Sequence, residues 1–263
     1  MPILTLTPDQ RAWSIAAVLL LGCAGLTLSS HLHARFFDDR DVGTVPVHVL
    51  TSSIVLLAAL PLVGLRWVLN SNAWCWRQPL PIGAPVLLLA GLGIAALVIA
   101  ADPRIARALG RGRRLVPAVE RQPTDLRPVG LAARTGGSLL LARDWTPTSR
   151  DLDLGIGLPW LLATALVEES IFRGVALNLV LRAADAPLRV LGVLAVLLAF
   201  ALSHIFFGWS QVAAKLPLSV LGTAAALLTG SVLPAAIGHL LFNAHVWRQR
   251  PLVIEQVENR VWR

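Results

Sequence analysis

Seven long apolar runs, separated by polar stretches, dominate the chain. Most of them reach about 18 residues, the length at which an α-helix crosses a hydrocarbon core of roughly 30 Å. Their apolar residues are continuous, whereas a transmembrane β-barrel would show short alternating segments. The pattern therefore predicts an all-α, polytopic transmembrane helical bundle of about seven spans, at residues 13–30, 47–69, 82–101, 154–181, 190–207, 212–229 and 232–247.

A polar segment at residues 102–153, with ten arginines and several prolines and glycines, divides the runs into two groups. Loops rich in arginine stay on the cytoplasmic side, where short amphipathic pieces can lie on an anionic membrane surface. The N-terminus is then expected outside. The predicted organisation is three N-terminal spans in residues 1–101, a cytoplasmic segment in 102–153, a four-span core in 154–247 and a cytoplasmic tail in 248–263.

Composition supports this class and excludes another. The chain is 56% hydrophobic and 14% charged, with a mean hydropathy of +0.68, whereas soluble domains carry about 25% charged residues. The net charge of +8 comes almost entirely from arginine, since Lys215 is the only lysine. Because the arginines lie between apolar runs, the lipid bilayer explains this charge better than nucleic acid does. No nucleic-acid partner is expected.

Three charged residues lie inside the fourth run, where each costs about 2.5–3.5 kcal/mol to insert and by default indicates function. Glu169 and Arg173 are four residues apart, so they share one helix face and suit an ion pair. Glu168 points about 100° away and needs a partner on another helix. The alternative is that all three form a buried network that only fixes helix packing.

Two other runs carry polar residues that match this group. His204 lies near the end of the fifth run, and His239 and Asn243 are four apart on one face of the last. Gly238 would allow a neighbouring helix to approach closely. Three histidines near the early spans have no matching partners and are not counted as site residues: His31, His33 and His48.

Together these residues form a set suited to peptide hydrolysis without a covalent intermediate. A carboxylate beside an imidazole can hold and deprotonate a water. A second imidazole and an amide can donate hydrogen bonds to a developing oxyanion. The alternative is a zinc site with Glu168, His204 and His239 as ligands, although the chain has no HExxH pair.

Three short motifs on separate runs resemble one known family. EESIFR at residues 168–173 matches an EExxxR motif, Phe200 to His204 an FxxxH motif, and His239 to Asn243 an HxxxN motif. In order and spacing they resemble the CAAX-processing and bacteriocin-processing proteases, also called Abi or type II CAAX prenyl endopeptidases. The resemblance covers residues 154–247.

The resemblance implies a glutamate-dependent intramembrane endopeptidase. Glu168 and His204 would then activate the water, and His239 and Asn243 would form the oxyanion hole. The supporting residues would be Glu169, Arg173 and Phe200. A metal-free site is favoured, with no cofactor, because an amide and a guanidinium suit hydrogen bonding better than ligation.

The expected substrate is a membrane-associated peptide or protein, and the arginine-rich, lysine-poor composition points to a bacterial cytoplasmic membrane. Two other functions stay open at this level. One is a non-catalytic immunity or scaffold protein with the same fold. The other is a proton- or ion-coupled transporter that uses Glu168 and Arg173 as a relay, although the paired half-spans typical of transporters are not found.

Overall fold

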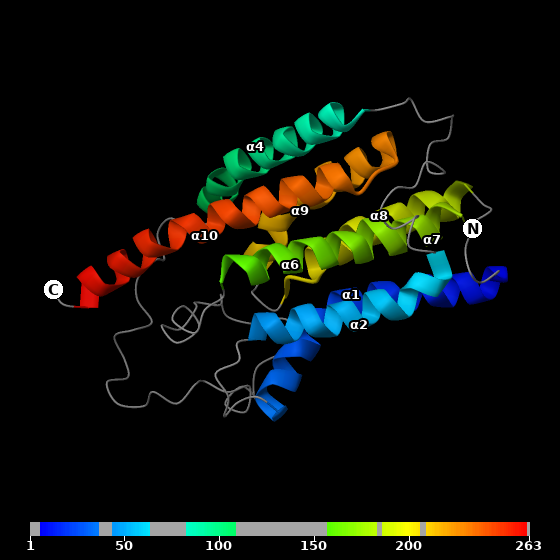
Figure 1. Ribbon diagram of the computed structural model, residues 1–263, viewed down its shortest axis with the longest axis horizontal. Coiled ribbons are helices and arrows are strands. Elements are labelled where there is room, and N and C mark those ends of the chain that lie inside the picture. The colour runs from blue at the N-terminus through cyan, green and yellow to red at the C-terminus, as the bar shows by residue number, and fades with distance from the viewer. Residues whose placement is uncertain are drawn as a thin grey trace.

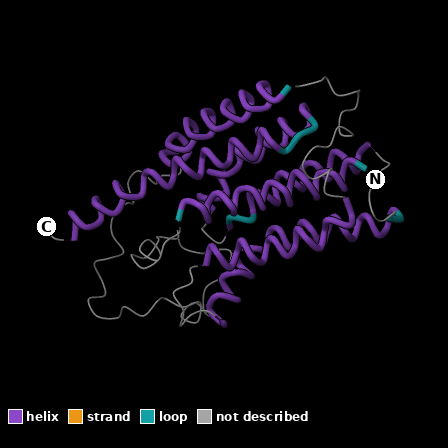
Figure 2. The backbone as a smooth tube through the Cα atoms, viewed as in Figure 1, coloured by secondary structure: helices purple, strands orange, loops and turns teal. Residues whose placement is uncertain are grey.

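The computed structural model describes residues 6–36, 44–63, 83–108, 157–182, 186–205 and 209–261. Regular structure in these residues is helical, as Figure 2 shows, and this confirms the all-α prediction. In chain order the elements are α1 (Pro8–Phe36), α2 (Thr44–Val63), α4 (Ala84–Ala108), α6 (Leu158–Glu169), η6 (Ser170–Ala176), α7 (Leu177–Leu181), α8 (Ala186–Leu202), α9 (Trp209–Thr229) and α10 (Leu233–Val261).

Three of the described helices are long and apolar enough to cross a membrane: Val45–Val63 in α2, Ala84–Ile105 in α4 and Gln211–Thr229 in α9. Large apolar side chains on them, such as Leu57 and Leu97, are exposed. Soluble proteins rarely expose apolar surface of this extent, whereas lipid solvates it. The protein is therefore an integral membrane protein, and the number of seven spans stays a prediction.

Predicted runs and observed helices agree in place and differ at their ends. Each of the seven runs contains a described helix, but α10 continues to Val261, well past the predicted end of the last span near Trp247. The end of the span itself stays a prediction. Hydrophobicity marks where a helix leaves lipid, not where its backbone hydrogen bonds stop. Similarly, α4 continues past Ala101 to Ala108. The rest of the arginine-rich segment, including its expected place on the membrane surface, lies outside the described residues.

One continuous helix formed by α6, η6 and α7 runs through the middle of the bundle (Figure 1). Helices α1 and α2 pack along one side of it, and α10 packs along α6 on another side. Helix α10 is in turn covered by α4 and α9, and α8 packs against α7 and α9. This arrangement places the middle helix in contact with both the first and the last described elements.

The middle helix changes type directly after its two glutamates. Ser170–Ala176 is a π-helix, and the backbone N–H of Leu177 donates to the carbonyl of Phe172, five residues earlier. From Ile171 to Ala176 the residues are all buried. A π-helix inside an α-helix is rare and occurs frequently at functional sites. Arg173 therefore lies in the π-helical part, although its predicted contact with Glu169 four residues earlier is still made.

Glycines bring α4 and α10 close together. A Cβ atom added to Gly238 would lie 2.6 Å from Cγ2 of Ile94, and one added to Gly91 would lie 2.6 Å from Cβ of Ile237. Real Cβ atoms essentially never approach this closely, so each position excludes a larger residue unless the helices move apart. The close helix approach predicted at Gly238 is confirmed.

Candidate active site

Both glutamates at the end of α6 are buried, and they face different partners. Glu168 is 4% exposed and Glu169 is fully buried. Glu169 contacts Arg173 and His239, whereas Glu168 contacts His48 on α2. A buried carboxylate needs hydrogen-bond donors to offset its desolvation. The two neighbours therefore belong to two different hydrogen-bond networks.

Glu169 forms the ion pair that its spacing predicts. Arg173 Nη1 donates to Glu169 Oε1 at 3.2 Å, and both side chains are 0% exposed. The same guanidinium donates through Nη2 to the Ser219 carbonyl on α9 at 3.2 Å. Its Cζ atom also lies 3.9 Å from the centre of the Phe200 ring. Arg173 thus ties the middle helix to α8 and α9.

His239 on α10 links the two networks. Its Nδ1 lies 3.0 Å from Glu169 Oε1. A carboxylate only accepts hydrogen bonds, so Nδ1 carries the hydrogen and Nε2 of the neutral ring is an acceptor. Nε2 faces Glu168 Oε2 at 3.9 Å, and both atoms are buried with no hydrogen-bond partner among the described residues. Two acceptors at this separation suit a shared donor, such as one water.

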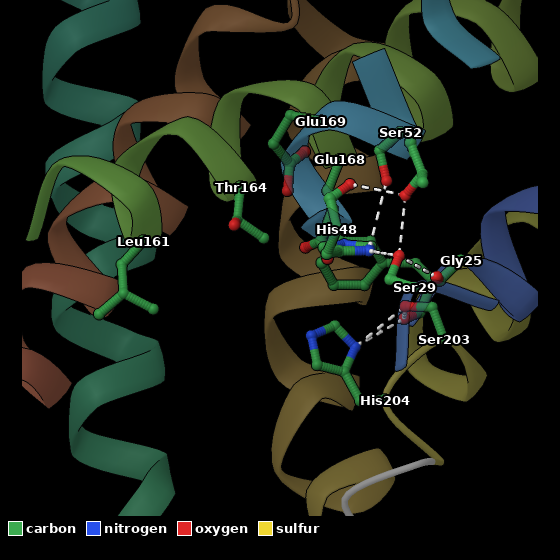
Figure 3. Close-up of polar contacts among 12 residues, drawn as sticks. Gly25, Ser29, His48, Ser52, Leu161, Thr164, Glu168, Glu169, Ser203 and His204 are labelled. Atoms are coloured by element: carbon green, nitrogen blue, oxygen red, sulfur yellow. Dashed lines mark hydrogen bonds and ion pairs between the residues drawn. The ribbon is translucent and has the colours of Figure 1, made fainter. Parts of the chain in front are cut away.

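Glu168 finds its partner on another helix, as predicted, but the partner is unexpected. His48 Nε2 lies 3.3 Å from Glu168 Oε1, and both side chains are buried. The prediction that His48 lacks a partner is therefore wrong. On the other side of its ring, His48 Nδ1 lies 3.3 Å from Ser29 Oγ and 3.4 Å from Ser52 Oγ. Figure 3 shows these contacts as a chain of dashed lines between α1, α2 and α6.

His204 lies in the turn that follows α8, and its hydrogen bonds are made within this turn and to the last residues of the helix. Its Nδ1 lies 3.0 Å from Ser203 Oγ and 3.2 Å from the Phe200 carbonyl. The side chain is buried. Among the described contacts, no hydrogen bond or ion pair joins it to Glu168. Figure 3 shows His204 and Ser203 joined to each other beside the His48 network.

Phe200 separates the two imidazoles of the predicted site. Its ring centre lies 5.6 Å from the His204 ring and 5.6 Å from the His239 ring. It also meets Phe172 edge-to-face, with the ring centres 5.4 Å apart. Such geometry favours aromatic pairs beyond their buried area. Phe200 is fully buried and holds α8, η6 and α10 in register around the glutamates.

Asn243 clamps α10 to α6. Its Nδ2 donates to the Leu161 carbonyl at 2.9 Å. His239 meets Glu169 while Asn243, four residues later, meets a residue seven positions before Glu168, so the two helices run antiparallel. Seven residues are two turns, about 10 Å of helix. The described hydrogen bond of Asn243 thus lies toward the N-terminal side of the glutamates.

The three sequence motifs leave out two ionisable residues near the site. His48 falls within the predicted run 47–69, and Lys215 falls within 212–229. Lys215 is buried, with Nζ lying 4.6 Å from the centre of the Phe242 ring. Ionisable side chains inside a span are costly wherever they occur, so this signal alone would have marked both.

The residues proposed as zinc ligands do not form a ligand cluster. Within the described part of the chain, no group of three or more His, Cys, Asp or Glu side chains could hold a metal ion. Nδ1 of His204 is turned to its own helix end, and Nδ1 of His239 is bonded to Glu169. The donor set around Glu168 therefore suits hydrogen bonding to a small polar molecule.

Comparison with known proteins adds one finding to this geometry. Residues 151–245 match the family model described as type II CAAX prenyl endopeptidase Rce1-like. This stretch is similar to the Rce1-like family. No curated protein and no solved structure matches the chain.

The Rce1-like region includes the three motifs and the helices from α6 into α10. The description names an endopeptidase, and the match supports the family resemblance seen in the three motifs. Helices α1, α2 and α4 lie before the matched residues. His48 therefore reaches Glu168 from outside the Rce1-like region.

Proposed function

We propose that this protein is an intramembrane endopeptidase of a bacterial cytoplasmic membrane, in which Glu168 activates a water to hydrolyse a peptide bond of a membrane-associated substrate. The observation that carries the proposal is the pair of buried acceptors, Glu168 Oε2 and His239 Nε2, which face each other at 3.9 Å. A water between them can donate one hydrogen to each. The similarity of residues 151–245 to an endopeptidase family supports the same reaction.

The chemistry needs one proton to move twice. Glu168 takes a proton from the water as its oxygen attacks the substrate carbonyl. The tetrahedral intermediate then breaks its C–N bond, and protonated Glu168 returns the proton to the leaving amine. Glu168 ends as a carboxylate, and no covalent enzyme intermediate forms. Both hydrogens of the water are accounted for, one on the amine and one on the new carboxyl product.

Glu169 supports this reaction without touching the water. It holds His239 through Nδ1 at 3.0 Å, which fixes the tautomer with Nε2 free to accept. Arg173 in turn holds Glu169. A carboxylate that orients an imidazole in this way is the logic of the serine-protease triad. Here it orients the His239 ring to accept a hydrogen bond from the water. In this proposal His239 therefore aligns the water, in place of the oxyanion-hole role that the family resemblance implies.

Asn243 and His204 are the two remaining residues of the predicted site. Asn243 donates one of its two N–H groups to Leu161, and among the described contacts the other remains for an oxyanion. No described hydrogen bond joins His204 to Glu168, so its place beside the water rests on the family resemblance. A metal-free reaction is part of this proposal.

The test compares two carboxylates in the purified protein, reconstituted into lipid vesicles with a panel of synthetic membrane-anchored peptides. New peptide ends are identified by mass spectrometry. Glu168→Gln removes the base but keeps its size, so cleavage should fall by at least about 100-fold. Asp9→Asn, at an exposed position in the first turn of α1, is the matched control and should cleave as the unchanged protein does. If Glu168→Gln cleaves as fast as the unchanged protein, the mechanism is refuted. If neither the unchanged protein nor the variants cleave any peptide, a non-catalytic scaffold is favoured.

A further inference from the structure

His48 is a buried histidine that the three sequence motifs leave out. It belongs to α2, lies 120 residues before Glu168 in the chain, and is 3% exposed. Its Nε2 approaches Glu168 Oε1 at 3.3 Å. The other oxygen of the same carboxylate, Oε2, faces His239 at 3.9 Å. One carboxylate oxygen of Glu168 therefore faces α2, and the other faces α10.

The hydrogen-bond directions around His48 determine its tautomer. Glu168 Oε1 can only accept, so His48 Nε2 carries the hydrogen. Nδ1 of the neutral ring is then an acceptor, and Ser52 Oγ at 3.4 Å can donate to it. Ser29 donates its hydroxyl hydrogen to the Gly25 carbonyl at 2.6 Å, so it has no second hydrogen to donate to Nδ1. The pattern makes His48 a donor aimed at Glu168.

A small cavity adjoins this contact. It measures about 20 Å³, enough for one water, and its polar lining comes from His48, Thr51, Ser52 and Glu168. The remaining walls are apolar and belong to α1, α2 and η6. Gly25 leaves room for the His48 ring, because a Cβ atom at this position would lie 3.3 Å from His48 Cε1. Removing the imidazole would therefore enlarge an existing space.

We propose that His48 is a positioning residue of the active site, which donates from Nε2 to Glu168 Oε1 and so turns Oε2 toward the water shared with His239. This inference rests on the proposed function. Without the donor, the carboxylate can rotate and share its lone pairs between several directions. The active site then includes α2, which lies outside the residues that match the protease family.

The test measures kcat and KM separately on a membrane-anchored peptide that the unchanged protein cleaves. His48→Ala should lower kcat by roughly 10- to 100-fold, the usual range for losing a hydrogen bond to a charged group, with little change in KM. His48→Gln keeps an N–H donor of similar reach and should restore most of the loss. Free imidazole should rescue His48→Ala through the enlarged cavity. His31→Ala, which removes an exposed histidine bonded only to the Thr27 carbonyl among the described contacts, is the matched control.

The outcomes separate this inference from the proposed function. If Glu168→Gln abolishes cleavage while His48→Ala keeps the full kcat, the hydrolytic function stands and the role of His48 is refuted. A purely structural role would lower thermal stability in His48→Ala and would give no rescue by imidazole or by His48→Gln, which also overturns the inference. If Glu168→Gln cleaves normally, the proposed function itself fails and this inference fails with it.

Discussion

Changing each of the two adjacent glutamates to glutamine should have different effects. One variant should lose mainly stability and the other mainly activity. Glutamine keeps the size of the side chain and removes only its charge. In Glu169→Gln, the guanidinium of Arg173 loses its carboxylate in a fully buried place. In Glu168→Gln, the described neighbour His48 still has an oxygen to which it can donate. We therefore expect Glu169→Gln to be the unstable variant.

The magnitude follows from what remains around each side chain. Arg173 keeps only the Ser219 carbonyl at 3.2 Å and the face of Phe200 as described partners. Removing one partner of a buried ion pair costs about 3–5 kcal/mol, because the remaining charge is left in low dielectric. Weakening the hydrogen bond at Glu168 costs about 1 kcal/mol. The gap of a few kcal/mol corresponds to roughly 5–15 °C in melting temperature for a chain of this size.

The assay is thermal unfolding of both variants in the same detergent or lipid nanodisc, followed by tryptophan fluorescence and by the monodisperse fraction after heating. Cleavage is measured on the same samples at a temperature where both are folded. Glu168→Gln should be folded and inactive, whereas Glu169→Gln should melt lower. Equal melting temperatures, or a lower one for Glu168→Gln, would refute the assignment of the ion pair as the structural member of the two.

Three further outcomes follow from other parts of the structure. Gly238→Val should lower the melting temperature because its side chain meets Ile94 at α4, whereas Gly93→Val, which meets nothing within 4 Å, should leave it nearly unchanged. Asn243→Ala should lose about 1 kcal/mol of stability with its bond to Leu161; an added loss in kcat of roughly 100-fold or more would show an oxyanion role, and an unchanged kcat would exclude one. Dialysis against a strong chelator, checked by elemental analysis, should leave cleavage intact, and a loss restored by zinc would contradict the metal-free proposal.

Helical periodicity was sufficient for contacts within one element. The spacing of four residues predicted the Glu169–Arg173 pair. The rotation of 100° between neighbouring residues predicted that the partner of Glu168 lies on another helix. Both deductions need only the geometry of a single α-helix. The all-helical architecture followed in the same way from the continuous apolar runs.

Contacts between distant runs could not be obtained from periodicity. The sequence places His48 near the start of the second run but does not say which helix packs beside it, so its contact with Glu168 was missed. Asn243 was placed correctly on the face of His239, yet its bond to Leu161 depends on the antiparallel packing of α10 and α6. The π-helix after Glu169 also had no sign in the apolar pattern, because residues 171–176 are all buried and show no polar face.

The division of partners around the two carboxylates has a consequence for biogenesis. His48 precedes Glu168 by 120 residues, and His239 follows Glu169 by 70. A chain made from its N-terminus already has α2 in place when α6 enters the bilayer, so Glu168 meets its first partner at once. The imidazole of α10 arrives last. A nascent chain therefore has a partner for each carboxylate before α10 docks, whereas the facing pair of Glu168 Oε2 and His239 Nε2 can form only once α10 is in place. Under the proposed mechanism, the chain would gain its water-binding pair only after the bundle is assembled.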